Sequence, residues 1–342
     1  MELDNHSIAQ LKSLLGAAKR CLVVAHVNPD GDAVGSSLGW ASCLQKAYPA
    51  LELRVFLPNN YPCNLSWITG ADKIMVYSDE AQRPAMHDYI KSCDLVFCLD
   101  ASLLARMDEL GKLVLGHPAP RVLVDHHIDP ATEEFTLIFS DTTACSTCEL
   151  VYRLLDAMGY APLIDLDVAE ALYVGLVTDT GSFSYNINTP ETFRIAAGLM
   201  ERGLDKNGVT SKVFDNFSEK RMRLMGYCLQ TKMRVLAKYG AAYISLSRAE
   251  LEDFGFQAGD TEGIVNLPLS IKGIGLAAFF TEALDRSHIR VSLRSTGTQI
   301  SVDKMARQYF NGGGHFNAAG GRYFESLENC EAFFEKIVKH EL

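Results

Sequence analysis

The residues in this sequence that are best suited to chemistry lie in one short segment, from His26 to Ser36. The segment follows an apolar stretch and reads His26-Val27-Asn28-Pro29-Asp30-Gly31-Asp32-Ala33-Val34-Gly35-Ser36. An imidazole and two carboxylates within one turn-rich loop can bind a divalent cation, and the nitrogen ligand favours manganese, zinc or iron over calcium. The segment therefore predicts a metal site whose remaining ligands lie elsewhere in the chain.

Further candidate ligands stand where predicted strands and a predicted helix end. Asp100 follows an apolar run at 95–99, the triplet Asp125-His126-His127 follows another at 122–124, and Asp179 follows a helical pattern at 168–177. Residues beyond the carboxyl ends of parallel strands share one edge of a sheet, so these side chains can converge with His26. The helix dipole disfavours a carboxylate at a helix C-terminus, and a cation beside Asp179 would offset that cost.

Each of these residues also has an ordinary structural explanation when it is considered alone. Asp30 and Asp32 can cap a helix that starts near Ala33, and a single histidine is more often a surface or core group than a ligand. The coincidence of four element ends is what favours a metal centre. The pair Cys145 and Cys148 lacks the second pair of a zinc ribbon and is better explained as the start of a helix.

The alternation of apolar and amphipathic segments predicts an α/β fold. Short apolar or β-branched runs occur at 21–25, 51–56, 94–99 and 121–124, and helical stretches separate them. This order is typical of a mostly parallel, doubly wound sheet with helices on both faces.

The second half of the chain predicts a smaller α/β domain. Its expected strands lie at 241–246, 275–281 and 288–293. We assign residues to three parts, which are a metal-binding catalytic domain at 1–190, a helical connector at 191–226 and a substrate-binding domain at 227–342. The active-site cleft is expected between the two domains.

Composition excludes several classes of function. A net charge of −10 over 342 residues argues against a broad basic surface for long duplex DNA. The nine cysteines follow no disulfide framework, and no apolar run reaches the length of a membrane span. These features predict a cytoplasmic protein with no membrane association.

Taken together, the motifs resemble those of the DHH phosphoesterase superfamily. The His26 loop, Asp100, the Asp125 triplet and the Thr-Asp-Thr-Gly segment around Asp179 occur in the usual order of its four motifs. The later segments Arg290-Val291-Ser292-Leu293-Arg294-Ser295 and Gly312-Gly313-Gly314-His315 resemble the DHHA1 domain that accompanies one branch of that superfamily. The resemblance covers nearly the whole chain.

The resemblance implies a metal-dependent hydrolase with two divalent cations, usually manganese. The ligands of the first cation would be His26, Asp30 and Asp100, and those of the second would be Asp32, Asp100, His126 and Asp179. Two cations that share a ligand can activate one water and stabilise both the attacking and the leaving oxygen of a phosphoryl transfer. Asp100 and two further residues form the expected catalytic set, in which Asp125 orients a ligating histidine and His127 donates or carries a proton at the reacting phosphate.

The resemblance also places substrate binding in the second domain. The expected contacts are Arg294, Ser295, Gly312, Gly313, Gly314 and His315. Bare backbone N–H groups of the glycines would approach an anion ahead of a helix formed from Ala318 and Ala319, with Arg294 adding a charged contact. The alternative explanation of the glycines is a flexible turn.

Within the superfamily, the sequence is most similar to the compact bacterial nanoRNases. That similarity implies hydrolysis of RNA fragments of a few nucleotides to mononucleotides, together with removal of the 3′-phosphate of adenosine 3′,5′-bisphosphate. The expected partners are short RNA and small nucleotides, and a homodimer is compatible with them. The alternatives are a phosphodiesterase for linear dinucleotides (pApA or pGpG), a polyphosphate or pyrophosphate hydrolase, and a catalytically silent nucleotide sensor.

Overall fold

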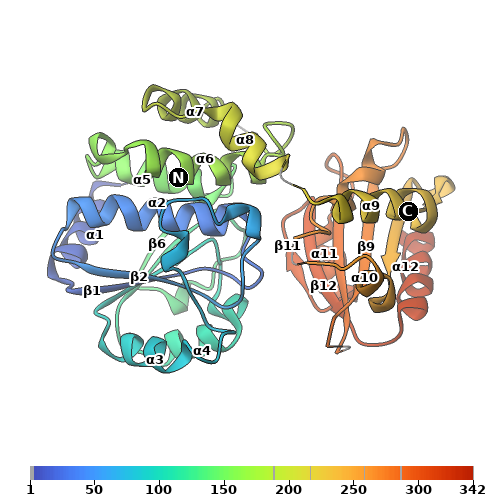
Figure 1. Ribbon diagram of the computed structural model, residues 1–342, viewed down its shortest axis with the longest axis horizontal. Helices are drawn as coiled ribbons and strands as arrows, with labels where there is room; N and C mark the ends of the chain where they lie inside the picture. The colour runs from blue at the N-terminus through green and yellow to red at the C-terminus, as the bar shows by residue number, and fades with distance from the viewer. Residues whose placement is uncertain (1–3, 188, 216, 258, 286, 342) are drawn as a thin grey trace. The chain divides into compact units, whose positions relative to one another are not determined.

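The chain folds into two compact units, Met1–Asn216 and Phe217–Leu342. The computed structural model describes residues 4–187, 189–215, 217–257, 259–285 and 287–341. Each unit consists of one six-stranded sheet and the helices that cover it (Figure 1). The sequence predicts three parts of the chain, the middle one a helical connector at 191–226. The boundaries of these three parts stay a prediction.

The sheet of the first unit is entirely parallel in its described pairings, with the strand order β3-β2-β1-β4-β5-β6. Its strands are β1 Arg20–Val24, β2 Glu52–Leu57, β3 Met75–Val76, β4 Leu95–Leu99, β5 Arg121–Asp125 and β6 Leu137–Ser140. All five residues of β4 are buried, as expected for a strand that helices cover on both faces. This order is that of a doubly wound α/β sheet, so the predicted fold class is confirmed.

Helices cover both faces of this sheet (Figure 1). One face packs against α1 Asn5–Ala17, α2 Gly31–Ala47, α5 Thr147–Ala157 and α6 Leu166–Asp179, and the other packs against α3 Arg83–Ser92 and α4 Asp108–Leu115. The unit also contains α7 Glu191–Glu201, α8 Lys206–Phe214 and the short helical turns η1 Cys63–Leu65, η2 Ala71–Lys73, η3 Leu104–Met107, η4 Thr132–Glu134 and η5 Ala161–Leu163. The helix expected after the pair Cys145 and Cys148 is therefore present as α5.

Helices α2 and α6 pack so closely that their contact requires glycine. A Cβ atom on Gly35 would lie 2.3 Å from the backbone oxygen of Ala171, and one on Gly175 would lie 2.4 Å from Oδ1 of Asp32. Real Cβ atoms do not approach other atoms this closely. The glycines therefore allow the first turn of α2 to lie beside the last turns of α6, which brings Asp32 near the C-terminal end of α6.

The second unit contains a mixed sheet with the strand order β11-β12-β10-β9-β8-β7. Its strands are β7 Arg234–Leu236, β8 Ala241–Leu246, β9 Leu276–Glu282, β10 Ile289–Ser295, β11 Gly313–Gly314 and β12 Ala318–Tyr323. Its helices are α9 Glu219–Tyr227, α10 Arg248–Asp253, α11 Val302–Tyr309 and α12 Leu327–Glu341, with the π-helical turn η6 Cys228–Lys232 and the 3₁₀ turns η7 Ala237–Tyr239 and η8 Ile264–Ser270. Among the described residues, no helix combines the length and the apolar composition needed to cross a bilayer.

The prediction of a helix at Ala318 and Ala319 is wrong, because these residues begin strand β12. Ala318 pairs with Arg294 and Ala319 with Leu293 in an antiparallel ladder. The next two residues are Gly320 and Gly321, which favour helices poorly, and a Cβ on Gly312 would lie only 1.9 Å from the oxygen of Gly320. The glycine-rich segment is thus required by close backbone packing between β11 and β12.

Candidate metal centre

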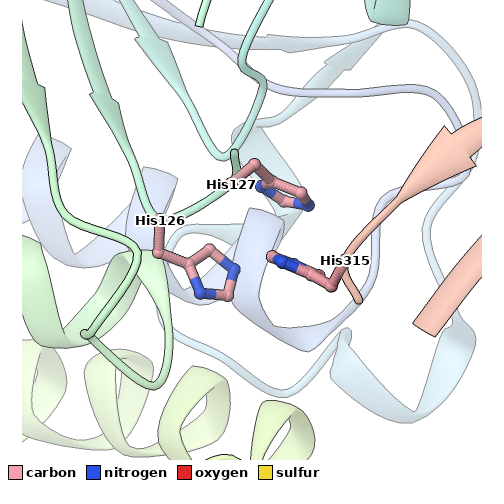
Figure 2. A group of neighbouring side chains, drawn as sticks. All are labelled: His126, His127 and His315. Atoms are coloured by element: carbon pink, nitrogen blue, oxygen red, sulfur yellow. The ribbon is translucent and has the colours of Figure 1, made fainter. Parts of the chain in front are cut away.

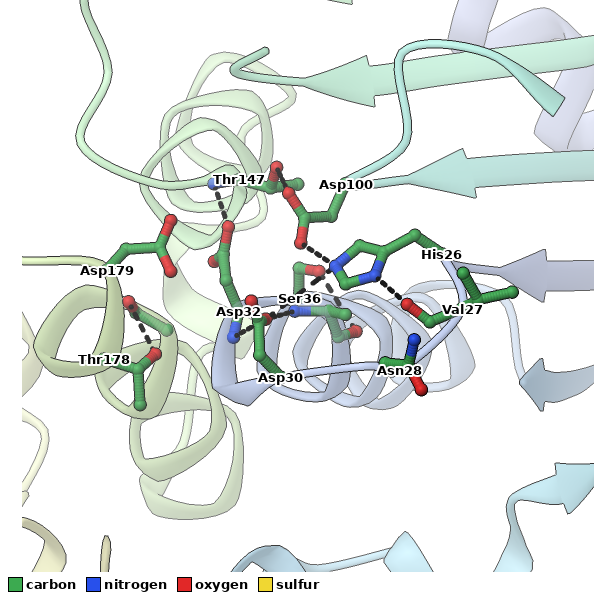
Figure 3. Close-up of polar contacts among 12 residues, drawn as sticks. His26, Val27, Asn28, Asp30, Asp32, Ser36, Asp100, Thr147, Thr178 and Asp179 are labelled. Carbon is green, nitrogen blue, oxygen red and sulfur yellow. Dashed lines mark hydrogen bonds and ion pairs between the residues drawn. The ribbon is translucent and has the colours of Figure 1, made fainter. Parts of the chain in front are cut away.

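The predicted ligands of the first unit gather at the carboxyl edge of its parallel sheet (Figure 3). His26 follows β1, Asp100 follows β4, and Asp125 ends β5 directly before His126 and His127. Strands β1, β4 and β5 are neighbours in the sheet, so the residues that follow them leave from adjacent positions. The structure therefore brings together side chains that are separated by up to about a hundred positions in the sequence.

His26, Asp30 and Asp100 form a first group of side chains that could hold a metal ion. Nε2 of His26 lies 3.1 Å from Oδ2 of Asp100 and 3.9 Å from Oδ1 of Asp30. The other ring nitrogen, Nδ1, donates to the carbonyl oxygen of Val27 at 2.8 Å. This bond fixes the ring so that Nε2 is the nitrogen that faces the carboxylates.

A second group consists of Asp32, Asp100 and His126, with Asp179 beside them. Nε2 of His126 lies 3.7 Å from Oδ2 of Asp32, 3.5 Å from Oδ1 of Asp100 and 3.2 Å from Oδ2 of Asp179. Asp179 is the last residue of α6, as the helical pattern predicted. Imidazole and carboxylate ligands in this proportion suit divalent transition metals.

Asp100 belongs to both groups and presents a different oxygen to each. Oδ2 faces His26 at 3.1 Å, whereas Oδ1 faces His126 at 3.5 Å. Its backbone has φ = 58°, a left-handed conformation that is uncommon for a residue other than glycine. Such conformations cluster at functional sites, where the surrounding structure maintains them.

Asp32 is held by the N-terminal ends of two helices. It lies in the first turn of α2, whose N-cap is Asp30, and its carboxylate accepts backbone N–H bonds from Thr147 at 2.6 Å and from Cys148 at 2.9 Å. Those two N–H groups open helix α5. Both helix dipoles favour a negative charge at this position.

The carboxylates of this centre are electrostatically costly without a cation. Burial, followed by the negative charge of Asp30, raises the pKa of Asp32 to about 6, even though two backbone N–H bonds oppose the shift. Burial and the charge of Asp32 likewise raise the pKa of Asp100 to about 6. A bound cation would stabilise both ionised carboxylates, so the residues present fit a metal centre.

Asp125 forms its short hydrogen bond with His127. Nδ1 of His127 lies 2.8 Å from Oδ1 of Asp125, and both side chains are buried or nearly so. Figure 2 shows the rings of His126 and His127, whose centroids are 4.8 Å apart. The family resemblance implied that Asp125 orients a ligating histidine, whereas this bond joins Asp125 to His127, whose expected role is proton transfer.

Thr147 contacts two of the predicted ligands but is not among the residues predicted from the sequence. Its hydroxyl donates to Oδ1 of Asp100 at 3.0 Å, and its backbone N–H donates to Asp32. The residue is fully buried at the start of α5. The available signal was the pair Ser146-Thr147 at a predicted helix start.

The predicted substrate contacts of the second unit lie at the ends of β10 and around β11. Ser295 ends β10, and its hydroxyl donates to the carbonyl oxygen of Ile300 and lies 2.9 Å from Oδ1 of Asn317. Arg294 precedes Ser295, and its guanidinium donates to the carbonyl oxygen of Leu293. His315, drawn in Figure 2, follows β11.

The backbone N–H groups near the glycines already have partners within this unit. Gly312 donates to the carbonyl oxygen of Ala306, Gly314 to Oδ1 of Asp303, and His315 to the carbonyl oxygen of Ala318. The expectation that bare glycine N–H groups of this segment approach an anion is therefore wrong for Gly312 and Gly314. Gly312 and Gly314 donate to residues of α11, Ala306 and Asp303, so these N–H groups are not left available as they would be at a helix start.

One serine in the first unit has the spacing of a hydrolase nucleophile without its structure. Gly35-Ser36-Ser37-Leu38-Gly39 matches the pattern Gly-x-Ser-x-Gly, in which the serine stands on a sharp turn between a strand and a helix. Ser37 instead lies fully buried in the interior of α2. The segment therefore does not form a nucleophile elbow.

Comparison with known proteins identifies both units. Residues 20–176 match the model of the DHH family, N-terminal domain, and residues 237–340 match that of the DHHA1 domain. The bifunctional oligoribonuclease and PAP phosphatase NrnA of Bacillus subtilis is 30% identical over 92% of this chain and 93% of its own length. A probable NrnA of Streptococcus mutans is also 30% identical, with the same coverage.

A solved structure supports the same assignment. An exopolyphosphatase-related protein from Bacteroides fragilis is 36% identical, covers 99% of this chain and 98% of its own, and superposes with a TM-score of 0.91. Its likeness extends over both units of the chain. On these grounds the chain belongs to the DHH family, in the branch that joins a DHH domain to a DHHA1 domain.

Proposed function

We propose that this protein is a metal-dependent phosphoesterase that hydrolyses short oligoribonucleotides to mononucleotides and removes the 3′-phosphate of adenosine 3′,5′-bisphosphate. The observation that carries the proposal is the pair of histidine and carboxylate groups that share Asp100. Two relatives with that pair of activities in their names are similar to the chain over nine-tenths of its length, which supports the choice of substrate.

We propose two divalent cations, with manganese as the metal. His26, Asp30 and Asp100 would hold one, and Asp32, Asp100, His126 and Asp179 would hold the other. When bound, such cations lower the pKa of a water molecule and stabilise the charge that develops on a phosphate. Asp100 would set the spacing between the two sites, because each of its oxygens faces a different histidine.

The proposed proton carrier is His127, positioned by Asp125. Burial, followed by the charges of Arg106 and of the neighbouring histidines, lowers the pKa of His127 well below its usual value. The ring is therefore neutral at pH 7, and its hydrogen bond to the carboxylate of Asp125 places the proton on Nδ1. A fixed neutral tautomer allows a histidine to take up a proton during the reaction.

The remaining parts of the proposal concern substrate and location. Arg294, Ser295, the glycines at 312–314 and His315 would contact the substrate, with side chains as the principal donors because several backbone N–H groups are already used. We place the enzyme in the cytoplasm, as the sequence predicts, and a homodimer remains compatible with this function.

Substrate length provides the main test of this function. We expect the manganese-loaded protein to hydrolyse two- and five-nucleotide RNA faster than a twenty-nucleotide RNA, because its net charge of −10 gives a long polyanion little general attraction. Product formation should be followed by chromatography for all three RNAs and for adenosine 3′,5′-bisphosphate. Faster cleavage of the longest RNA would contradict the proposal.

A second candidate function is hydrolysis of polyphosphate. It is favoured by the likeness to a structure described as an exopolyphosphatase-related protein. Release of inorganic phosphate from polyphosphate, with no cleavage of a dinucleotide under the same conditions, would support this function over the first. Linear dinucleotides such as pApA and pGpG belong in the same assay as the remaining alternative.

Thr147→Val should weaken cation binding about 10-fold, in the range found when groups that orient metal ligands are lost. Valine keeps the shape of threonine but removes the hydroxyl that donates to Asp100. Calorimetric titration with manganese measures the effect, and Thr147→Ser, which keeps a hydroxyl, should restore most of the affinity. Equal affinities for the valine and serine variants would rule out this role of the hydroxyl.

Manganese affinity should rise as the pH rises through about 6, since each ligand must lose its proton before it binds metal. The pKa values of Asp32 and Asp100 are raised to about 6 in the metal-free protein, and Asp100 raises that of His26 against the opposing effect of burial. Binding at pH 6 should therefore release more protons than binding at pH 8. Calorimetry in two buffers with different ionisation enthalpies measures that number, and equal release at both pH values would contradict the assignment.

A further inference from the structure

One face of the second sheet carries an unusual ladder of side chains along strands β10 and β12. Arg290 lies directly opposite Arg322 in the antiparallel register, Ser292 lies opposite Gly320, and Arg294 lies opposite Ala318. Because every second residue of a strand points to the same side, all these positions share one face. The ladder thus alternates cationic positions with small residues that leave open space above the sheet.

The pairing of Arg290 with Arg322 costs stability. Like charges at directly opposite positions of an antiparallel pair repel each other. Both side chains are exposed. Among the described residues, no ion pair and no side-chain hydrogen bond is formed by either guanidinium.

An aromatic pair continues the ladder beyond the arginines. Ile289 and Tyr323 are paired in the register, and His288 precedes Ile289 while Phe324 follows Tyr323. The ring centroids of His288 and Phe324 are 6.3 Å apart. Phe324 is 65% exposed, one of the most exposed large apolar side chains among the described residues. An exposed aromatic ring beside unpaired cations is the combination with which proteins bind single-stranded nucleic acid, through base stacking and phosphate contacts.

The surrounding structure leaves this half of the sheet face uncovered by an apolar core. The hydrophobic cluster on this face draws its sheet residues from β8 and β9, including Ile244 and Phe279, and none from β10 or β12. The other face of β10 contributes Ile289, Val291 and Leu293 to a separate core. Arg290 and Arg322 are therefore exposed at the surface, and these two cations stand out in a chain whose net charge is −10.

We propose that the exposed face of β10 and β12 binds the additional nucleotides of a short single-stranded RNA, beyond those next to the bond that is hydrolysed. Arg290 and Arg322 contact a phosphate, and Phe324 stacks on a base. Residues two apart on a strand are ~6.8 Å apart, so Arg290 lies ~14 Å from Arg294, the predicted substrate contact on the same face. The inference rests on the proposed function, because it extends the substrate that Arg294 contacts.

RNA binding without hydrolysis tests this surface. Calorimetry in EDTA should compare two- and five-nucleotide RNA for the wild-type protein and the variants Arg290→Gln, Arg322→Gln and Phe324→Ala. We expect each variant to lose about 5-fold or more in affinity for the five-nucleotide RNA and less than about 2-fold for the dinucleotide. Each arginine variant should also lower the salt dependence of five-nucleotide binding by about one phosphate contact, whereas Phe324→Ala should leave it unchanged.

The matched control is Arg223→Gln, which removes an exposed arginine of α9 that pairs with Glu219. It should leave the affinity for both RNAs unchanged. Equal losses for the two lengths, or no loss beyond that of the control, would overturn the surface assignment, as would equal wild-type affinity for both RNAs.

The same titrations separate this inference from the proposed function. Length-dependent binding by a wild-type protein that hydrolyses no RNA would contradict the function and leave the surface standing. Hydrolysis of RNA without length-dependent binding would support the function and contradict the surface assignment. Because the three substituted side chains are exposed or partly exposed, thermal unfolding should give near wild-type midpoints for all variants.

Discussion

Asp100→Asn should reduce turnover of a short RNA to below about a hundredth of the wild-type value, since the shared ligand loses its charge in both metal groups. Asparagine keeps the size of the side chain but not the second anionic oxygen. The manganese bound per chain, measured after dialysis by atomic absorption, should fall as well. Retention of more than about a tenth of the activity would refute the bridging role of Asp100.

The same substitution should stabilise the metal-free protein at pH 7. Burial and the charge of Asp32 raise the pKa of Asp100 to about 6, so its proton favours the folded state below pH 4 and that contribution is lost as the pH rises through about 6. Asparagine does not ionise, so the variant should avoid this loss and have a free energy of unfolding at pH 7 that is higher by an amount on the order of 1–3 kcal/mol. Thermal unfolding in EDTA measures it, and Asp88→Asn, at an exposed position of α3 that pairs with Lys91, is the control expected to change neither property.

Gly175→Ala should lower the free energy of unfolding by about 1–3 kcal/mol, because the added methyl group has no space. It would lie 2.3 Å from Sγ of Cys148 and 2.4 Å from Oδ1 of Asp32. Relief of this overlap must move Asp32 or the start of α5, so activity should fall by about 10-fold or more. Urea unfolding and hydrolysis of a dinucleotide measure the two effects.

Gly16→Ala is the matched control for this substitution. Gly16 lies in α1, and a Cβ atom there would have no neighbour within 4 Å. Alanine at such a position should stabilise the protein by about 0.4–1 kcal/mol, and activity should stay at the wild-type level. Equal stability of the two variants would show that the contact between α2 and α6 tolerates a larger side chain.

The sequence was most informative where one short segment carries the signal. Strand β4 is apolar throughout, β1 is apolar after Arg20, and both are followed by chemically distinct residues. Their positions and the polarity of the edge beyond them could therefore be predicted within a residue or two. His26 and Asp30 could be recognised together because four positions separate them. The end of α6 was predicted near Asp179, where the structure places it, whereas the grouping of Asp179 with His126 was implied by the family resemblance.

The contacts that were missed depend on packing between distant segments. Thr147 reaches Asp100 only because α5 directs its N-terminus at the sheet edge, and the two residues are 47 positions apart in the sequence. The partner of Asp125 depends on the side-chain rotamers of two consecutive histidines, which the sequence does not specify. At Ala318, the pairing with β10 prevailed over a local pattern of small residues that resembled the start of a helix.

The strand order of the first sheet allows the segments that connect the strands to change in length without displacing the predicted metal ligands. His26, Asp100 and His126 leave three adjacent strands, so the distances between them follow from the ~4.8 Å spacing of a sheet and not from the lengths of the connecting segments. Insertions or deletions in the connections at the opposite edge can therefore accumulate during evolution without moving a ligand. Homologues of very different length can thus keep the same reaction.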